Sequence, residues 1–185
     1  MTALLSLHSA IFMRLDKSAD WLLPTLARLT FAGVLLMYFI NSGLTKLGDG
    51  IGGIWTPSVG AYAQIFPRAF EAVGYDSDAL SAYHTFVVLM GTWAEFILPA
   101  LIIVGLFTRL AALGMIGFVV VQSLTDIYGH GQTSELGAWF DRFANAAILD
   151  QRGLWIFLLL LLVFKGAGPL SLDRALGPKE TAKPF

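Results

Sequence analysis

The sequence predicts an all-α integral membrane protein: a four-helix bundle with amphipathic helices at the membrane interface. Hydrophobic residues make up 56% of the 185 residues and charged residues only 14%, whereas soluble domains carry roughly 25% charged residues. Between residues 84 and 128, two long apolar runs meet at a turn that contains a single arginine. Each run is near the ~20 residues that a helix needs to cross a bilayer core of ~30 Å. Further apolar runs precede and follow this hairpin.

The N-terminal part of the chain predicts a surface helix followed by the first span. Residues 3–15 form an amphipathic pattern, with apolar side chains at helical spacing at Leu4, Leu7, Ile11 and Leu15. We expect a short helix that lies on the membrane, with an irregular N-terminus as the alternative. The first span is expected at 21–46, where Pro24 lies close enough to the helix start to be tolerated. Residues 47–80 are rich in Gly, Pro and Asp and predict an external loop.

The remaining spans follow from the hairpin and the apolar run after it. The second and third spans are expected at 82–107 and 109–128. A second external loop, 129–153, should contain an amphipathic helix at 138–149. The fourth span is expected at 154–170, because its apolar core is short and must extend past a lysine that can reach the interface. The whole chain, 1–185, is then a single membrane domain.

The lysines and arginines are unevenly divided between the two predicted sides of the membrane. One side would hold Arg14, Lys17, Arg109, Lys165, Arg174, Lys179 and Lys183. The other side would hold Lys46, Arg68, Arg142 and Arg152. Since cytoplasmic loops carry an excess of cations, this bias predicts a multi-pass protein of the bacterial inner membrane with both termini in the cytoplasm.

Polar residues inside the predicted spans form a column. At 1.5 Å per residue, Glu95 lies about 18 Å from the inner end of its helix, and Gln122 reaches a similar height. Asp126 lies one turn further out. An ionisable group in hydrocarbon costs at least ~2.5–3.5 kcal/mol, so such groups face protein or water and are functional candidates. Arg28 comes from the opposite half, and we expect it to form a structural ion pair with Glu95.

Several chemistries could use this column. We expect Glu95 and Asp126 to transfer protons as catalytic groups. A quinone could be held by the side chains near the outer mouth and the middle of the bundle: His84, Gln122, Tyr128, Trp93 and Lys46. A metal site made of His84, Asp126 and His130 is a weaker alternative, since the spacing matches no common metal motif.

The chain contains no cysteine, which excludes thiolate-bound iron–sulfur clusters and c-type haem attachment. The formal net charge of −1 gives no indication of nucleic-acid binding.

Three motifs connect the chain to a known family. Arg28 is followed by an apolar run into NSGLTKLGD (41–49), then by WAEFILPALIIVGLFTRLAAL (93–113) and GAGPLSLDRALG (166–177). In this order they resemble the DoxX family of small membrane proteins. The resemblance implies a four-helix bundle and the membrane subunit of a quinone-linked oxidoreductase. The thiol chemistry of similar bundles cannot apply to a chain without cysteine. A membrane anchor that recruits a partner protein through its outer loops, a homo-oligomer, and a proton or small-solute pathway remain alternatives.

Overall fold

The computed structural model describes residues 2–177, and this part of the chain is helical, apart from turns, connecting segments and one isolated bridge between Leu47 and Pro57. The α-helices are α1 (Thr2–Val34), α2 (Leu36–Leu44), α3 (Val59–Ile65), α4 (Pro67–Ala72), α5 (Ala82–Val104), α6 (Thr108–Leu124), α7 (Arg152–Lys165) and α8 (Leu172–Leu176). Short 3-10 turns occur at Ile51–Ile54 and Ser77–Ala79. One π-helical turn, Thr125–Gly129, continues α6, and another, Ala147–Gln151, precedes α7.

Three helical segments are long and apolar enough to cross a membrane: Ala82–Val104, Thr108–Gly129 and Ala147–Lys165. The pair α1 and α2, bent by 42° at Leu35, provides a fourth. The predicted all-α membrane architecture is therefore confirmed. The fourth span differs from the prediction at both ends. It begins at Ala147, and it stops at Lys165 because Gly166 adopts a φ of +77°, which a right-handed helix cannot continue.

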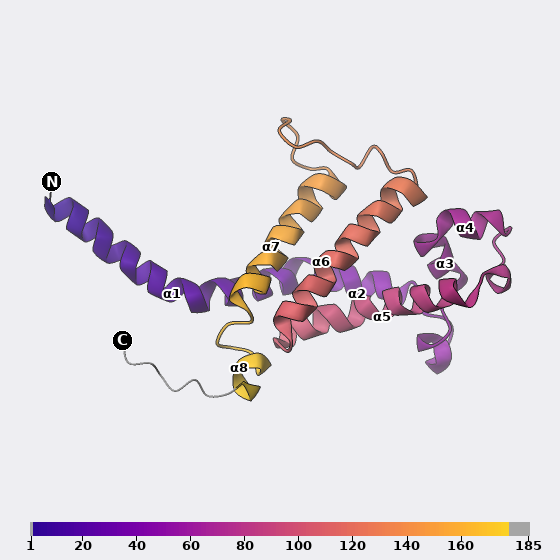
Figure 1. Cartoon of the computed structure of the whole chain (residues 1–185), viewed down its shortest axis with the longest axis horizontal. Helices are drawn as coiled ribbons and strands as arrows, with labels where there is room; N and C mark the ends of the chain where they lie inside the picture. The colour runs from indigo at the N-terminus through magenta and orange to yellow at the C-terminus, as the bar shows by residue number, and fades with distance from the viewer. Residues whose placement is uncertain (1, 178–185) are drawn as a thin grey trace.

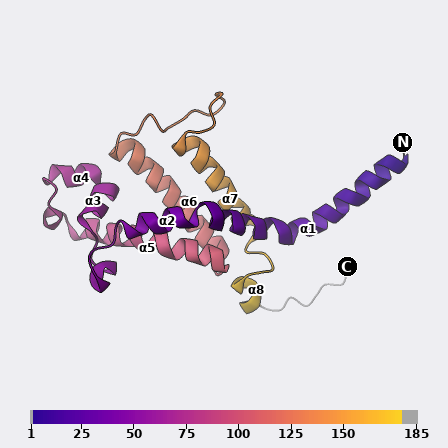
Figure 2. The ribbon, with the colours of Figure 1, turned by 180° about the vertical axis from the view of Figure 1, so that it is seen from behind.

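The spans pack as two pairs that cross each other: α1 and α2 with α5, and α6 with α7 (Figures 1 and 2). Helices α6 and α7 run side by side, α6 also packs on α5, and α7 also packs on α1. Helix α2 lies along α5. The first part of α1 projects away from the bundle, on the side where α8 lies, and α3 and α4 cover the opposite end. The bundle therefore has two distinct ends, joined by the four spans.

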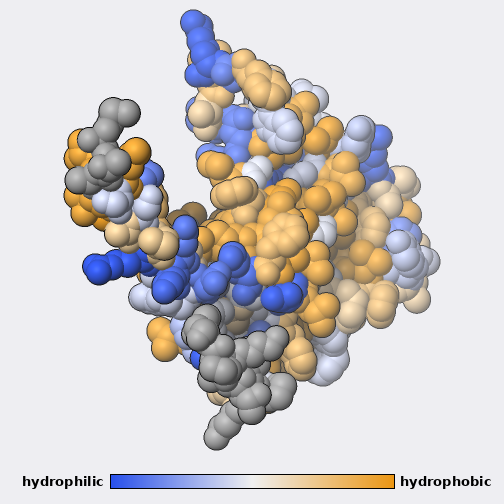
Figure 3. Space-filling view, turned by 60° about the vertical axis from the view of Figure 1, so that its left-hand side comes forward, coloured by the Kyte–Doolittle hydropathy of each residue, from blue (hydrophilic) through white to orange (hydrophobic). Residues whose placement is uncertain are grey.

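The core lies where α1, α2, α5, α6 and α7 meet, and its fully buried side chains include Phe31, Phe39 and Met115. Phe39 contacts the rings of Phe118 and Trp155 edge to face, an arrangement that aromatic rings favour. The outer faces of the spans are also apolar, and Figure 3 shows hydrophobic residues over much of one face. These exposed apolar surfaces suit contact with lipid.

The first helix differs from its prediction. Residues 3–15 are helical, but they belong to one continuous helix, Thr2–Val34, and the expected separate surface helix is wrong. No glycine or proline occurs between residues 3 and 23, so nothing in the backbone interrupts the helix before the span. Apolar side chains of this projecting part, such as Leu4 and Ile11, are exposed.

Two connections also differ from their predictions. The expected helix at 138–149 is wrong, because residues 138–146 form turns and irregular backbone. There the Asp141 carboxylate accepts the N–H of Phe143 at 2.8 Å, and the Asp150 carboxylate accepts the N–H of Ala146 at 3.0 Å. Such side-chain bonds compete with helix formation. The segment predicted as a loop at 47–80 instead contains α3 and α4. Helix α3 packs on α5 around the buried ring of Phe70.

Candidate functional site

Arg28 does not pair with Glu95, and this predicted ion pair is wrong. Its guanidinium donates to the carbonyl oxygens of Ile102 (2.9 Å) and Ile103 in α5. It also donates to those of Ala167 (3.1 Å) and Leu170, after α7. The last carbonyls of a helix lack partners within the helix and attract a cation. Glu95 lies seven residues before Ile102, a rise of about 10 Å along α5.

Asp173 completes this end of the bundle. Its carboxylate accepts the N–H groups of Phe107 (2.7 Å) and Thr108 (2.9 Å), which begin α6. Burial alone would raise the pKa of Asp173, but these hydrogen bonds and the nearby Arg28 charge outweigh burial and hold the pKa below its usual value. Arg28 and Asp173 together tie the ends of α5, α6 and α7 to α1.

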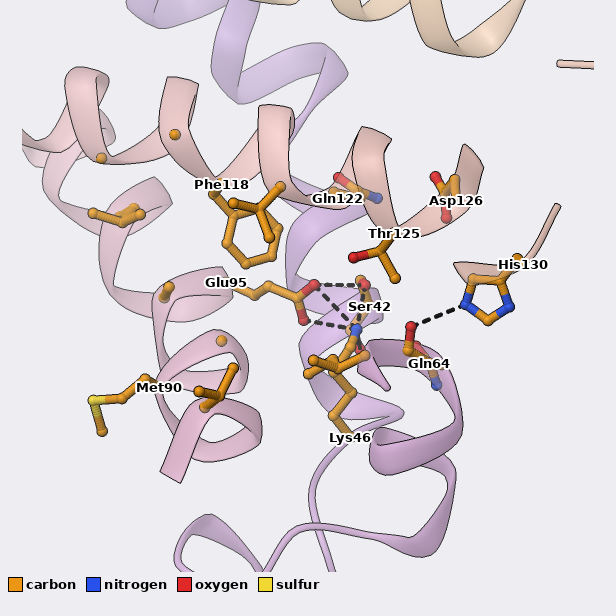
Figure 4. Close-up of a pocket in the computed structure, with 18 of the residues that line it drawn as sticks. Ser42, Lys46, Gln64, Met90, Glu95, Phe118, Gln122, Thr125, Asp126 and His130 are labelled. Carbon is orange, nitrogen blue, oxygen red and sulfur yellow. Dashed lines mark hydrogen bonds and ion pairs between the residues drawn. The ribbon is translucent and has the colours of Figure 1, made fainter. Parts of the chain in front are cut away.

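Glu95 pairs instead with Lys46, deep in the bundle (Figure 4). The Lys46 ammonium lies 3.0 Å from both carboxylate oxygens, and their side chains are only 7% and 2% exposed. Ser42 donates to the same carboxylate at 2.9 Å and accepts from Lys46 at 2.8 Å. Lys46 follows Ser42 by one helical turn, so its side chain folds back along the end of α2. The result is a buried ion pair whose polar atoms are satisfied.

A cavity of about 580 Å³ lies against this ion pair. Its walls come from α2, α3, α5, α6 and the turns that follow α6, and they are mostly apolar, with Met90, Leu98 and Phe118 among them. Gly117 of α6 leaves room in the cavity, because a Cβ added there would meet no atom within 4 Å. The cavity also reaches the outer surface of the bundle, because exposed Phe86 and Val121 line it together with buried Glu95.

Five of the predicted site residues line this cavity: Lys46, Glu95, Gln122, Asp126 and His130. Gln122 donates to the Tyr38 hydroxyl at 2.7 Å, while its buried carbonyl oxygen has no hydrogen-bond donor within residues 2–177. The His130 ring bonds to the carbonyl oxygen of Gln64 at 3.0 Å. These five side chains therefore share one cavity, and the partner predicted for Glu95 was wrong.

Asp126 is already paired. Its carboxylate lies 2.6 Å from a guanidinium nitrogen of Arg152, and Arg152 also donates to the Ser123 hydroxyl at 3.1 Å. The charge count placed Arg152 among the external cations, yet its side chain is only 8% exposed. Sequence reasoning missed this pair. The signal was present, since an aspartate within a span requires a partner, and Arg152 stands directly before the fourth apolar run.

The other three predicted ligands lie outside the cavity lining. His84 bonds to the Ser81 hydroxyl at 2.8 Å at the start of α5, and Tyr128 is 66% exposed. Trp93 donates to the carbonyl oxygen of Ile54 at 2.7 Å and so fastens the first connection to α5. The metal alternative of His84, Asp126 and His130 is not assembled, and within residues 2–177 no three His, Cys, Asp or Glu residues are grouped to hold a metal.

Comparison with known proteins places this chain in a family. The family model for DoxX matches residues 23–125, from the second part of α1 to the end of α6. This chain belongs to the DoxX family. The matched region contains Arg28, Lys46 and Glu95, whereas Arg152 and Asp173 lie beyond it. The chain is also similar to an uncharacterized membrane protein of Mycobacterium tuberculosis, with 31% identity over 144 residues, which cover 76% of this chain and 79% of that protein. No solved structure matches the chain.

Proposed function

We propose that this DoxX-family chain is the membrane subunit of a redox system and binds a quinone in the cavity beside Lys46 and Glu95. The observation that carries the proposal is a buried ion pair at the wall of an apolar cavity of about 580 Å³. Pockets for small ligands are typically ~300–1,000 Å³, mostly apolar, with a few placed polar groups. A quinone has matching features: an apolar ring and tail, and two carbonyl oxygens.

The polar wall can serve both redox forms of such a ligand. The Lys46 ammonium donates to Ser42 and Glu95, and it can donate to a quinone carbonyl when one of these bonds is given up. The unpartnered carbonyl oxygen of Gln122 can accept from a quinol hydroxyl. Glu95 and Asp126 both line the cavity and can exchange protons there. Reduction of a quinone to a quinol takes two electrons and two protons. In this proposal an oxidoreductase partner supplies the electrons, and the chain supplies the binding site and the protons.

The cavity also suits a ligand that arrives from the lipid. Phe86 and Val121 line it while facing outward, 61% and 62% exposed, respectively. Small residues of α5 and α6, including Gly91 and Gly114, place little side-chain volume in the gap between these helices. A lipid-soluble tail could therefore remain in the bilayer while the ring lies against Phe118.

Filling the cavity should abolish quinone binding. We expect Gly117→Leu to weaken the binding of a short-tailed naphthoquinone or benzoquinone by at least about tenfold, because the new side chain occupies the open space beside Gly117. The measurement is calorimetric titration of the purified protein in detergent. Gly33→Leu is the matched control, since Gly33 also has no atom near an added Cβ and lies outside the cavity lining. Arg174→Ala, at the other end of the bundle, should likewise have little effect.

Two results would count against the proposal. Equal affinity of Gly117→Leu and the unmodified chain would place any quinone outside this cavity. If neither quinone binds the unmodified chain, the alternative of a membrane anchor for a partner protein replaces the quinone-binding proposal.

We also propose that both ends of the chain face the cytoplasm of a bacterial inner membrane. Lys46 and Arg152 are buried in ion pairs, so they no longer count as loop cations on the side of α3. Among the described residues, that side keeps Arg68 and Arg142. The opposite side keeps Arg14, Lys17, Arg109, Lys165 and Arg174. The bias toward the end that holds α8 is therefore stronger than the sequence count suggested.

Reporter fusions test this orientation. A reporter that is active only outside the cytoplasm should be active when fused after Tyr75 or Ser134, in the two long connections. The same reporter should be silent after Lys183, which, like Lys179, lies outside the described residues. The reverse pattern would contradict the orientation and leave the cavity proposal untouched.

A further inference from the structure

A second cavity, of about 320 Å³, lies at the end of the bundle that holds α8. It is formed where α1, the end of α7 and the segment leading into α8 meet, and its lining is Asp20, Trp21, Lys165, Gly168, Pro169 and Arg174. The quinone proposal does not use this cavity. Its lining differs in character from that of the first cavity, because charged side chains form half of it.

The charges in this second cavity favour an anion. Lys165 lies 2.7 Å from Asp20, but both side chains are well exposed, at 44% and 78%. Exposed ion pairs of this kind are weak, so Lys165 can share its charge with a ligand. Within residues 2–177 no hydrogen bond or ion pair involves the Arg174 guanidinium; only its backbone N–H is bonded, to Ser171. One acid against two cations leaves a net positive charge.

Arg174 is the side chain best suited to recognise a phosphate. A guanidinium presents a planar set of donors that matches two phosphate oxygens at once, and an ammonium adds a point charge. The neighbouring Asp173 does not neutralise Arg174, because its carboxylate is held by the N–H groups of Phe107 and Thr108. Lys165 and Arg174 can therefore bind a phosphate together. Among the described carboxylates of this cavity, only that of Asp20 competes with the phosphate for these cations.

The surroundings of the cavity favour an amphiphile over a free anion. Trp21, in its wall, is 51% exposed, and tryptophan prefers the level of the lipid headgroups. Two apolar residues next to lining residues in the sequence are also exposed: Phe164, before Lys165, and Leu170, after Pro169, both 74%. Figure 3 shows hydrophilic residues gathered near the foot of the projecting helix, beside hydrophobic surface. A cationic cavity at the border of an apolar surface matches a headgroup attached to acyl chains.

We propose that this cavity binds the phosphate of an anionic phospholipid. Arg174 and Lys165 hold the phosphate, Trp21 lies beside the headgroup, and the acyl chains cover the exposed apolar residues at the end of α7. The bound lipid would join the middle of α1 to the end of α7 and to α8. Basic pockets at the ends of transmembrane helices bind anionic lipids in this way.

Lipid retention by the full-length protein tests the proposal. In detergent, native mass spectrometry should show phosphatidylglycerol retained more strongly than phosphatidylcholine, and phosphatidylglycerol should raise the melting temperature. The double variant Lys165→Gln with Arg174→Gln should weaken phosphatidylglycerol binding by about thirtyfold, roughly fivefold for each cation. Arg68→Gln with Arg142→Gln removes the same charge at the other end of the bundle and should leave binding unchanged.

Three results would overturn the proposal. Equal retention of the two lipids would show that the charge of the headgroup is not recognised. A melting-temperature rise with inorganic phosphate as large as that with phosphatidylglycerol would identify a free anion site. Unchanged phosphatidylglycerol binding by the Lys165→Gln, Arg174→Gln protein would place the lipid elsewhere. Quinone titration of the same variant, expected to be normal, separates failure here from failure of the first cavity.

Discussion

Arg28→Met is expected to lower the free energy of unfolding by at least about 3–5 kcal/mol. The guanidinium donates to four backbone carbonyls in two segments, at the end of α5 and after α7. Each buried acceptor that loses its donor costs ~1–3 kcal/mol. Methionine can occupy much of the same volume but offers no donor. The loss therefore reports hydrogen bonding more than packing.

Unfolding in mixed micelles with increasing dodecyl sulfate, followed by tryptophan fluorescence, measures this effect. The free energy of unfolding of Arg28→Lys should lie between those of Arg28→Met and the unmodified protein. An ammonium keeps the charge, but it cannot donate to four carbonyls as a planar guanidinium does. Arg109→Met is the control, since its exposed side chain lies at the same end of the bundle and forms no hydrogen bond within residues 2–177. Equal stability of the Arg28→Met and Arg109→Met proteins would contradict the structural role of Arg28.

The spans and the level of the polar side chains could be read from the sequence. Apolar run length sets the number of helices that can cross a membrane, and the rise per residue sets depth along them. These two rules placed Glu95 and Gln122 at similar heights, and both line one cavity. They also singled out Lys46 near the end of its helix. Depth along the helices was therefore predictable.

The partners of these side chains were not predictable in the same way. Periodicity indicates which face a residue occupies, but backbone carbonyls exist at every position and leave no mark in the sequence. The sequence therefore suggested an acidic side chain, Glu95, as the partner of Arg28, whereas carbonyl groups at a helix end accept its hydrogen bonds. A charge count likewise treats Arg152 as a loop residue, because it cannot show that the chain turns Arg152 toward Asp126.

The ends of the helices were the least predictable feature. Asp141 and Asp150 accept local backbone N–H groups and prevent the helix that the apolar spacing of residues 138–149 suggested. A positive φ at Gly166 ends α7 at Lys165, where hydropathy alone favoured continuation. In both places short-range backbone geometry outweighs the apolar pattern, which carries no information about it.

Breaking the buried ion pair should have the second large effect. Glu95→Ala leaves the Lys46 ammonium, whose side chain is 7% exposed, without its counter-ion. Removal of one partner of a buried pair typically costs ~3–5 kcal/mol, because an uncompensated charge remains in a medium of low polarity. Lys46→Met should lower the free energy of unfolding by a similar amount, because it leaves the Glu95 carboxylate buried without a counter-ion. The same micelle unfolding experiment measures both variants.

The double variant Lys46→Met with Glu95→Leu separates charge from packing. With both charges removed, no uncompensated charge remains at this position, and apolar side chains fill similar volumes. Replacement of a buried ion pair by apolar residues is often neutral or stabilising. We therefore expect the double variant to be clearly more stable than either single variant, while quinone binding is lost in all three. Additive destabilisation, with the double variant the least stable protein, would show that Lys46 and Glu95 stabilise the bundle independently of each other. The ion pair would then not be the unit that forms this wall of the cavity.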